Sequence, residues 1–178
     1  MNNFSTDDAW QKMKRDTILA PQFYGNNTIV PTGRYVFMDK GRLAKILQRR
    51  MEVDTILQGK DGAAVAIEEK IVRWPGYRYP NYCLETKSCT VPGHESDGWM
   101  VYGQADYLLY CFEQESGDLD CHLIDFQKLK AWFWPRESGF KPFKMSEQNQ
   151  TFGRQVPIAH VEREVGVYRV NCPVWLAA

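Results

Sequence analysis

A β-hairpin between residues 53 and 73 constrains the fold more than any other segment of this sequence. A short run of strand-forming residues, Val53–Gln58, precedes the turn Lys60-Asp61-Gly62, and a longer run rich in valine, isoleucine and alanine follows at residues 63–73. Glycine suits the end of such a turn because it adopts a positive φ without strain. With a three-residue loop, Gly59 pairs with Ala63 and every further pair of residue numbers also sums to 122. The chain is therefore expected to contain at least one tightly specified antiparallel strand pair.

Helices and further strands are expected on both sides of this hairpin. Amphipathic patterns predict helices at residues 7–19, where Pro21 ends the first one, and at 40–51. Further strands are predicted at residues 82–87, 105–112, 121–126 and 166–170, a short helix is predicted at 127–134, and the remaining C-terminal tail is expected to be irregular. The sequence thus predicts an α+β fold, with a central mixed β-sheet flanked by helices.

Composition predicts one globular domain of ordinary type over residues 1–178. The hydrophobic fraction is 44% and the charged fraction 25%, which excludes a disordered chain. The apolar runs are much shorter than the roughly 20 residues that cross a bilayer, and the first residues contain no secretory signal. Lysine and arginine together number 22, as do aspartate and glutamate, so no global field attracts nucleic acid. These features favour a cytoplasmic protein with no membrane partner.

The register of the hairpin places two carboxylates face to face. Because 54 and 68 sum to 122, Asp54 is predicted to lie directly opposite Glu68, on the same face of the sheet. Two like charges at that distance repel each other, and a shared divalent cation such as Mg²⁺ or Mn²⁺ would remove the repulsion. Lys70, two residues beyond Glu68, shares this face, whereas Glu69 points the opposite way among apolar neighbours. A surface cluster of cross-strand charges is the alternative interpretation.

This arrangement resembles the Asp…(Asp/Glu)-X-Lys signature of the PD-(D/E)XK nuclease-like superfamily. The resemblance extends over about residues 50–134 and includes uncharacterised bacterial and phage proteins of that type. Its residues are Val53-Asp54, Lys60-Asp61-Gly62, Ile67-Glu68-Glu69-Lys70, Leu84-Glu85, Ser88, Gly98-Trp99 and Ala105-Asp106-Tyr107. The resemblance implies a restriction-endonuclease-like core at about 40–134, between an N-terminal helix and a C-terminal extension.

The resemblance also implies a chemistry and a role for each motif residue. Asp54 and Glu68 would hold Mg²⁺ or Mn²⁺, and Lys70 would be the catalytic lysine in hydrolysis of a phosphodiester of nucleic acid, with DNA favoured over RNA. The alternative is a catalytically inactive binding or interaction module of phage or prophage origin, since a fold does not settle activity. The acidic residue that the family carries on its first helix has no clear match here; Asp8 and Asp16 are the nearest carboxylates.

A second Glu-X-Lys sequence begins at Glu85. This residue is either the true motif, an additional metal ligand, or a partner for Lys70 if residues 82–87 pair antiparallel with the long strand. In that register Arg73 would face Tyr82.

Basic side chains interleaved with aromatic ones predict a nucleic-acid surface. The candidates for phosphate contacts are Arg73, Arg78, Lys128, Lys130 and Arg136. Core aromatics beneath a solvated charged face would give the same pattern, so both interpretations of the segment 128–144 remain open.

The five cysteines indicate reduced thiols more than a disulfide framework. Cys83, Cys89 and His94 lack the C-x₂-C spacing of zinc sites, and nothing in the sequence supplies an oxyanion hole for a cysteine nucleophile.

Overall fold

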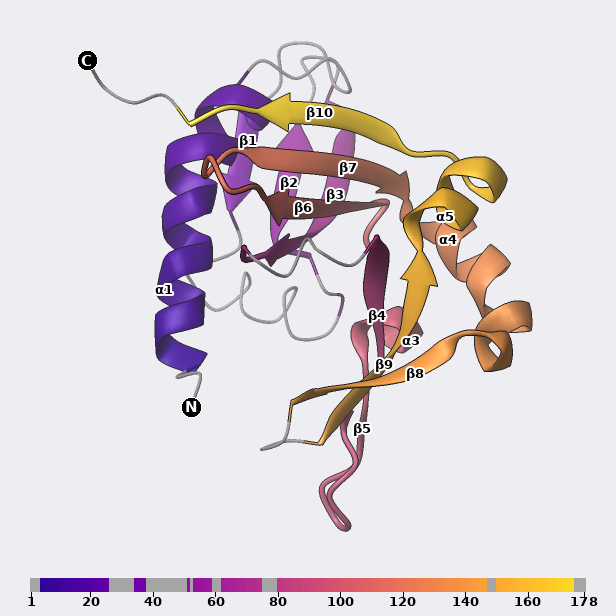
Figure 1. Ribbon diagram of the computed structural model, residues 1–178. Helices are drawn as coiled ribbons and strands as arrows, with labels where there is room; N and C mark the ends of the chain where they lie inside the picture. Colours follow the sequence, from indigo (N-terminus) through magenta and orange to yellow (C-terminus); the bar gives the residue numbers. More distant parts are fainter. Residues whose placement is uncertain are drawn as a thin grey trace.

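The computed structural model describes residues 4–25, 34–37, 51, 53–58, 62–74, 80–146 and 150–174. Two β-sheets and the helices around them make up this part of the chain (Figure 1). The helical elements are α1 (Phe4–Lys14), the π-helix η1 (Arg15–Tyr24), α3 (Trp99–Tyr102), α4 (Phe126–Phe133), the 3₁₀ helix η3 (Trp134–Gly139) and α5 (Ile158–Glu164). The fold class is therefore α+β, as the sequence predicts. None of the described helices is long and apolar enough to cross a membrane.

The larger sheet is mixed and has six strands in the order β1-β2-β3-β6-β7-β10. Its strands are β1 (Arg34–Phe37), β2 (Thr55–Gln58), β3 (Ala64–Val72), β6 (Tyr107–Glu113), β7 (Leu119–Asp125) and β10 (Tyr168–Cys172). Only the β3–β6 pair is parallel. Gly62, with φ of 84°, ends the β2–β3 turn in the conformation that the sequence predicts.

The smaller sheet is antiparallel and has four strands in the order β5-β4-β9-β8. Its strands are β4 (Asn81–Cys89), β5 (Ser96–Asp97), β8 (Lys141–Ser146) and β9 (Thr151–Pro157). Strands β8 and β9, together with α5, occupy the tail that the sequence analysis expected to be irregular, so that expectation is wrong.

Two apolar clusters cover opposite faces of the six-stranded sheet. Alternate residues of β6 divide between them, with Leu108 in one cluster and Leu109 in the other. The first cluster also contains residues of α3, α4, α5 and the smaller sheet, and the second contains residues of η1. Figure 1 shows α1 on one side of the larger sheet and the smaller sheet on the other. The central sheet is thus flanked on both faces.

The N-terminal helix extends further than predicted. Pro21 lies inside η1 and does not end the helix, which continues to Tyr24. In this winding the Gly25 amide donates to the carbonyl of Ala20, at 2.9 Å, five residues back. The missing amide of Pro21 therefore removes one bond without stopping the chain from coiling. The predicted helix at 40–51 lies outside the described residues except for Met51, which is helical.

Candidate functional site

Glu68 and Lys70 form an ion pair on one face of β3. The Lys70 Nζ contacts Glu68 Oε1, and it also lies 5.2 Å from the ring centroid of Trp99 at the start of α3. The Glu68 side chain is fully buried, whereas the Lys70 side chain is 29% exposed. The ammonium group therefore lies between the buried carboxylate and solvent.

Asp54 directly precedes β2 in the sequence. The predicted register is confirmed through β2, where Thr55 faces Ile67 and the pairs again sum to 122. The pairing ends at Thr55, and the Asp54 amide donates to the carbonyl of the same Ile67 at 2.9 Å. Asp54 is therefore not directly opposite Glu68, and that part of the register prediction is wrong.

The Asp54 carboxylate contacts the backbone between the two glutamates. Its Oδ2 accepts a hydrogen bond from the Glu69 amide at 2.9 Å, and its Oδ1 lies 3.9 Å from Nη2 of Arg15. The structure thus brings Asp54 against the Glu68–Glu69 peptide. Its carboxylate also lies near the guanidinium group of Arg15, which pairs with Glu69.

Glu69 is the centre of a buried polar network on the face of β3 opposite to Glu68. Its Oε2 accepts from Nε of Arg15 at 2.6 Å, and its Oε1 accepts from the hydroxyls of Tyr24 and Thr55. Burial raises the pKa of Glu69 above its ordinary value, although the Arg15 guanidinium opposes this effect. Arg15 is a residue that the sequence analysis missed. Asp16 is next to Arg15 and was one of two possible matches to the acidic residue on the family's first helix. Its side chain is exposed and pairs with Lys12.

Glu85 lies on β4 in the smaller sheet, and β4 does not pair with β3. Strand β4 pairs with β5 and β9, so Glu85 faces Gly153, while Lys70 faces Tyr110 of β6. The predicted registers of Lys70 with Glu85 and of Arg73 with Tyr82 are therefore wrong. The Glu85 carboxylate accepts from the Ser88 hydroxyl.

Gly98 brings α3 close to β4. A Cβ at Gly98 would lie 2.5 Å from the Glu85 carbonyl oxygen, so only glycine permits this approach. The adjacent Trp99 contacts Lys70. The Gly98-Trp99 pair thus connects the environments of Glu85 and Lys70.

The predicted nucleic-acid residues fall into different environments. Arg73 is exposed, with its guanidinium 5.3 Å from the ring centroid of Trp10, and Arg78 lies outside the described residues. Lys128 is exposed and pairs with Asp125 at 3.3 Å. Arg73 and Lys128 are therefore accessible to a phosphate.

Lys130 has a structural role at the end of α3. Its ammonium donates to the carbonyls of Val101 at 3.1 Å and Gly103 at 2.7 Å, and burial lowers the pKa of Lys130. Arg136 donates to the Trp132 carbonyl at 2.9 Å and lies over the same indole ring.

The aromatic residues of the segment 128–144 divide in the same way. Phe133 is fully buried in the core, whereas Trp134 is 39% and Phe143 36% exposed. Trp134 and Val101 line a groove of about 660 Å³ between the end of α4 and the smaller sheet. Phe133 therefore belongs to the core, whereas Trp134 and Phe143 lie at the surface.

A buried histidine forms a second polar cluster that the sequence analysis did not find. His122 Nδ1 lies 2.7 Å from the Tyr82 hydroxyl, and its Nε2 accepts from Nε of Arg169 at 2.8 Å. Asp120 Oδ2 lies 3.2 Å from the same nitrogen. Burial lowers the pKa of His122. The only sequence signal was a histidine within an apolar strand, which more often indicates a satisfied core residue.

All five cysteines are free, and Cys111, Cys121 and Cys172 are buried together. Among the residues that the structure describes, no group of three or more histidine, cysteine, aspartate or glutamate side chains is arranged to hold a metal ion.

Comparison with protein-family models, with curated proteins and with solved structures finds no match to this chain. Functional inference therefore depends on the geometry above and on the motif resemblance.

Proposed function

We propose that this chain is a metal-dependent nuclease that hydrolyses phosphodiester bonds of nucleic acid, with DNA as the favoured substrate. In this proposal the larger sheet and its flanking helices form a restriction-endonuclease-like core. Asp54 and Glu68 hold Mg²⁺ or Mn²⁺, and Lys70 acts on the phosphate or on the attacking water.

One observation carries the proposal. The three motif residues are neighbours beyond the Thr55–Ile67 end of the β2–β3 pairing, because Lys70 contacts Glu68 and the Asp54 carboxylate accepts a hydrogen bond from the amide of the next residue, Glu69. The mixed sheet with helices on both faces supports the same interpretation, as does the contact of Gly98-Trp99 with Glu85 and Lys70.

The donor chemistry fits a divalent cation. Mg²⁺ prefers oxygen ligands and is commonly held by one or two carboxylates together with waters and substrate phosphate. The fully buried Glu68 carboxylate is accompanied by a cation, Lys70, in this structure. A bound metal ion would supply Lewis-acid polarisation of the phosphoryl group and a more acidic water.

Lys70 would then stabilise charge that develops on the phosphate. Its side chain is partly exposed and is oriented by Trp99, so its ammonium group can turn from Glu68 toward a ligand without unfolding β3. Arg73 and Lys128 are the accessible cations for contacts with the nucleic-acid backbone.

Calorimetric titration with Mn²⁺ tests the metal site without knowledge of the substrate. Wild-type protein should bind Mn²⁺ and Glu68→Gln should lose this binding, while the matched surface control Asp97→Asn should retain it. Asp97 is an exposed carboxylate that pairs with Lys87 on the smaller sheet. Equal Mn²⁺ binding by wild type and Glu68→Gln would show that Glu68 is not a metal ligand.

A cleavage assay tests the reaction itself. End-labelled single-stranded and duplex DNA and RNA are incubated with protein and Mg²⁺ or Mn²⁺, and Lys70→Ala should lose cleavage by at least two orders of magnitude. If the variant and the wild type cut equally, the activity does not belong to this chain.

A specific observation favours the catalytically inactive nuclease-fold module as a second candidate. Both proposed ligand carboxylates are engaged by groups of the protein: Glu68 by Lys70, and Asp54 by the Glu69 amide and Arg15. Nucleic-acid binding that is unchanged by Mn²⁺ and by Glu68→Gln, without cleavage, would favour this candidate.

A further inference from the structure

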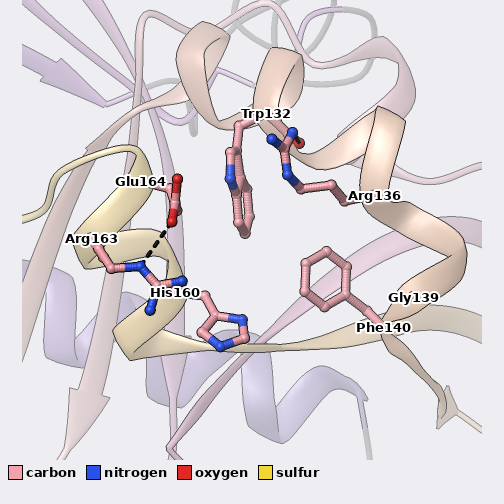
Figure 2. Close-up of a pocket in the computed structure, with 7 residues that line it drawn as sticks. All are labelled: Trp132, Arg136, Gly139, Phe140, His160, Arg163 and Glu164. Carbon is pink, nitrogen blue, oxygen red and sulfur yellow. Dashed lines mark hydrogen bonds and ion pairs between the residues drawn. The ribbon is translucent and has the colours of Figure 1, made fainter.

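A polar cavity lies between the end of α4, η3 and α5. Its volume is about 330 Å³. Figure 2 shows the Trp132 indole ring between Glu164 and Arg136, and the other lining residues are Gly139, Phe140, His160 and Arg163. None of these residues belongs to the Glu68 site.

The Trp132 indole nitrogen is the first indication of a ligand. This atom is buried, and among the described residues it has no hydrogen-bond partner. A buried N–H donor without a partner costs free energy and is uncommon in folded proteins. An acceptor atom of a bound ligand would satisfy it.

Positive charge surrounds the same cavity. Arg136 and Arg163 contribute two guanidinium groups, and His160 adds a further donor, against the one carboxylate of Glu164. Arg163 Nε pairs with Glu164 Oε1 at 2.8 Å. Hydrogen bonding from Arg163 lowers the pKa of Glu164, and the charges of Arg136 and His160 lower it further. The cavity is therefore electropositive even with its own carboxylate ionised.

Each arginine uses only part of its guanidinium group within the protein. Arg136 bonds the Trp132 carbonyl through Nη1, and Arg163 bonds Glu164 through Nε. Within the described chain, the terminal Nη2 of Arg136 and both terminal nitrogens of Arg163 bond no other residue. Planar arginine forks match the oxygen geometry of phosphate, which a lysine does not.

Aromatic surfaces form the other half of the cavity. The rings of Trp132 and Phe140 lie 5.6 Å apart at 45°, and the Arg136 guanidinium lies 5.7 Å from the Trp132 ring centroid. Aromatic faces of this kind stack with nucleobases regardless of their sequence.

We propose that this cavity binds a nucleotide phosphate, with the phosphate on Arg163 and the base against Trp132 and Phe140. The phosphate belongs either to a free mononucleotide or to the terminal phosphate of a nucleic-acid strand. The site does not depend on Glu68 or on a metal ion, so it can be tested apart from the nuclease proposal.

The test is calorimetry on the full chain in EDTA, with thymidine 5′-monophosphate, thymidine and inorganic phosphate as probes. The monophosphate should bind at least tenfold more tightly than thymidine or inorganic phosphate. Arg163→Gln should weaken that binding at least tenfold, and Trp132→Phe, which keeps the ring and removes the N–H, about threefold. Lys87→Gln, which removes an exposed positive charge on the smaller sheet outside the cavity, is the matched control and should bind as wild type does.

A second pair of probes distinguishes the two sources of phosphate. If the ligand is a strand end, a thymidine oligonucleotide with a 5′-phosphate should bind more tightly than the same oligonucleotide without it. If the phosphorylated oligonucleotide binds only as tightly as the monophosphate, the ligand is a free nucleotide. Binding of thymidine as tight as that of the monophosphate would overturn the proposal. So would binding that Arg163→Gln leaves unchanged, since Arg163 is exposed and its substitution leaves the core intact.

Discussion

Glu68 and Glu69 are consecutive residues of one strand, yet they occupy opposite faces of the sheet and have opposite kinds of partner. Glu69 is held by Arg15, Tyr24 and Thr55, which come from the N-terminal helix and a neighbouring strand. Glu68 is held by Lys70, a flexible side chain from its own strand that reaches toward solvent. Both carboxylates are buried, but only Glu68 has a partner that can move away.

This difference separates a structural carboxylate from a candidate functional one. Glu69 connects η1 to β2 and β3 through fixed groups, so replacing any of them disturbs the fold. Lys70 can exchange its contact with Glu68 for a contact with a ligand while the backbone stays in place. A functional role is therefore expected for Glu68 and a structural one for Glu69.

The largest effect is expected from breaking the Glu69 network. Glu69→Gln keeps an oxygen for the Tyr24 and Thr55 hydroxyls but removes the carboxylate that bonds Arg15, which then has only the more distant Asp54 at 3.9 Å. Loss of one member of a buried ion pair costs about 3–5 kcal/mol of unfolding free energy. Urea denaturation of wild type and variant measures this loss.

A double-mutant cycle with Arg15→Met provides the control for that prediction. Arg15→Met should cost much less in the Glu69→Gln background than in the wild type, because the charge it would leave behind is already gone. Strictly additive costs would show that the two groups do not stabilise each other.

A smaller effect on stability is expected on the Glu68 face. Lys70→Met should lower the unfolding free energy by less than Glu69→Gln does, because the lysine end of the pair is partly exposed and water can take the place of its ammonium group. If Mn²⁺ binds at Glu68, the same variant should bind it roughly fivefold more tightly, equivalent to about 1 kcal/mol, since the competing ammonium group is absent. If Lys70→Met lost more unfolding free energy than Glu69→Gln, Glu68 and not Glu69 would be the structural carboxylate.

The smallest expected effects are opposite pH dependences for the two faces. Burial raises the folded-state pKa of Glu69 above 4.5, so its contribution to stability is complete below pH 4.5 and is lost as pH rises through the raised pKa. Burial lowers the folded-state pKa of His122 below 6.5, so its contribution is complete above pH 6.5 and is lost as pH falls toward the lowered pKa.

Urea unfolding between pH 4 and 8 measures both slopes, each expected to span about 1 kcal/mol or less. Glu69→Gln should flatten the loss on raising the pH, and His122→Gln should flatten the loss on lowering it. A variant whose profile parallels the wild type would assign that slope to other groups.

Local patterns predicted the hairpin and most strands because they depend on neighbours in sequence. Alternation and the Lys60-Asp61-Gly62 turn fixed the β2–β3 register as far as Thr55, and apolar runs located β6 and β7 within two residues. The position of Asp54 was not predictable in this way, because it depends on the hydrogen bonds of its amide with the Ile67 carbonyl and of its carboxylate with the Glu69 amide.

Prediction failed most where an element needed partners distant in sequence. The segments 141–146 and 151–157 form strands only because they pair with each other and with β4, and they carry little alternation of their own. Placement of β4 beside the long strand β3 failed for the same reason, since β6 takes that position.

The sequence by itself determined the α+β class, the hairpin, the opposite faces of Glu68 and Glu69, and the proximity of Lys70 to Glu68. These follow from the two-residue period of a strand, which is a local property of the backbone. Only the tertiary structure decided that Arg15 pairs with Glu69, that Lys130 bonds the end of α3 and that Trp132 lies in a cationic cavity. Those contacts join segments far apart in sequence, and packing of the whole chain is what brings them together.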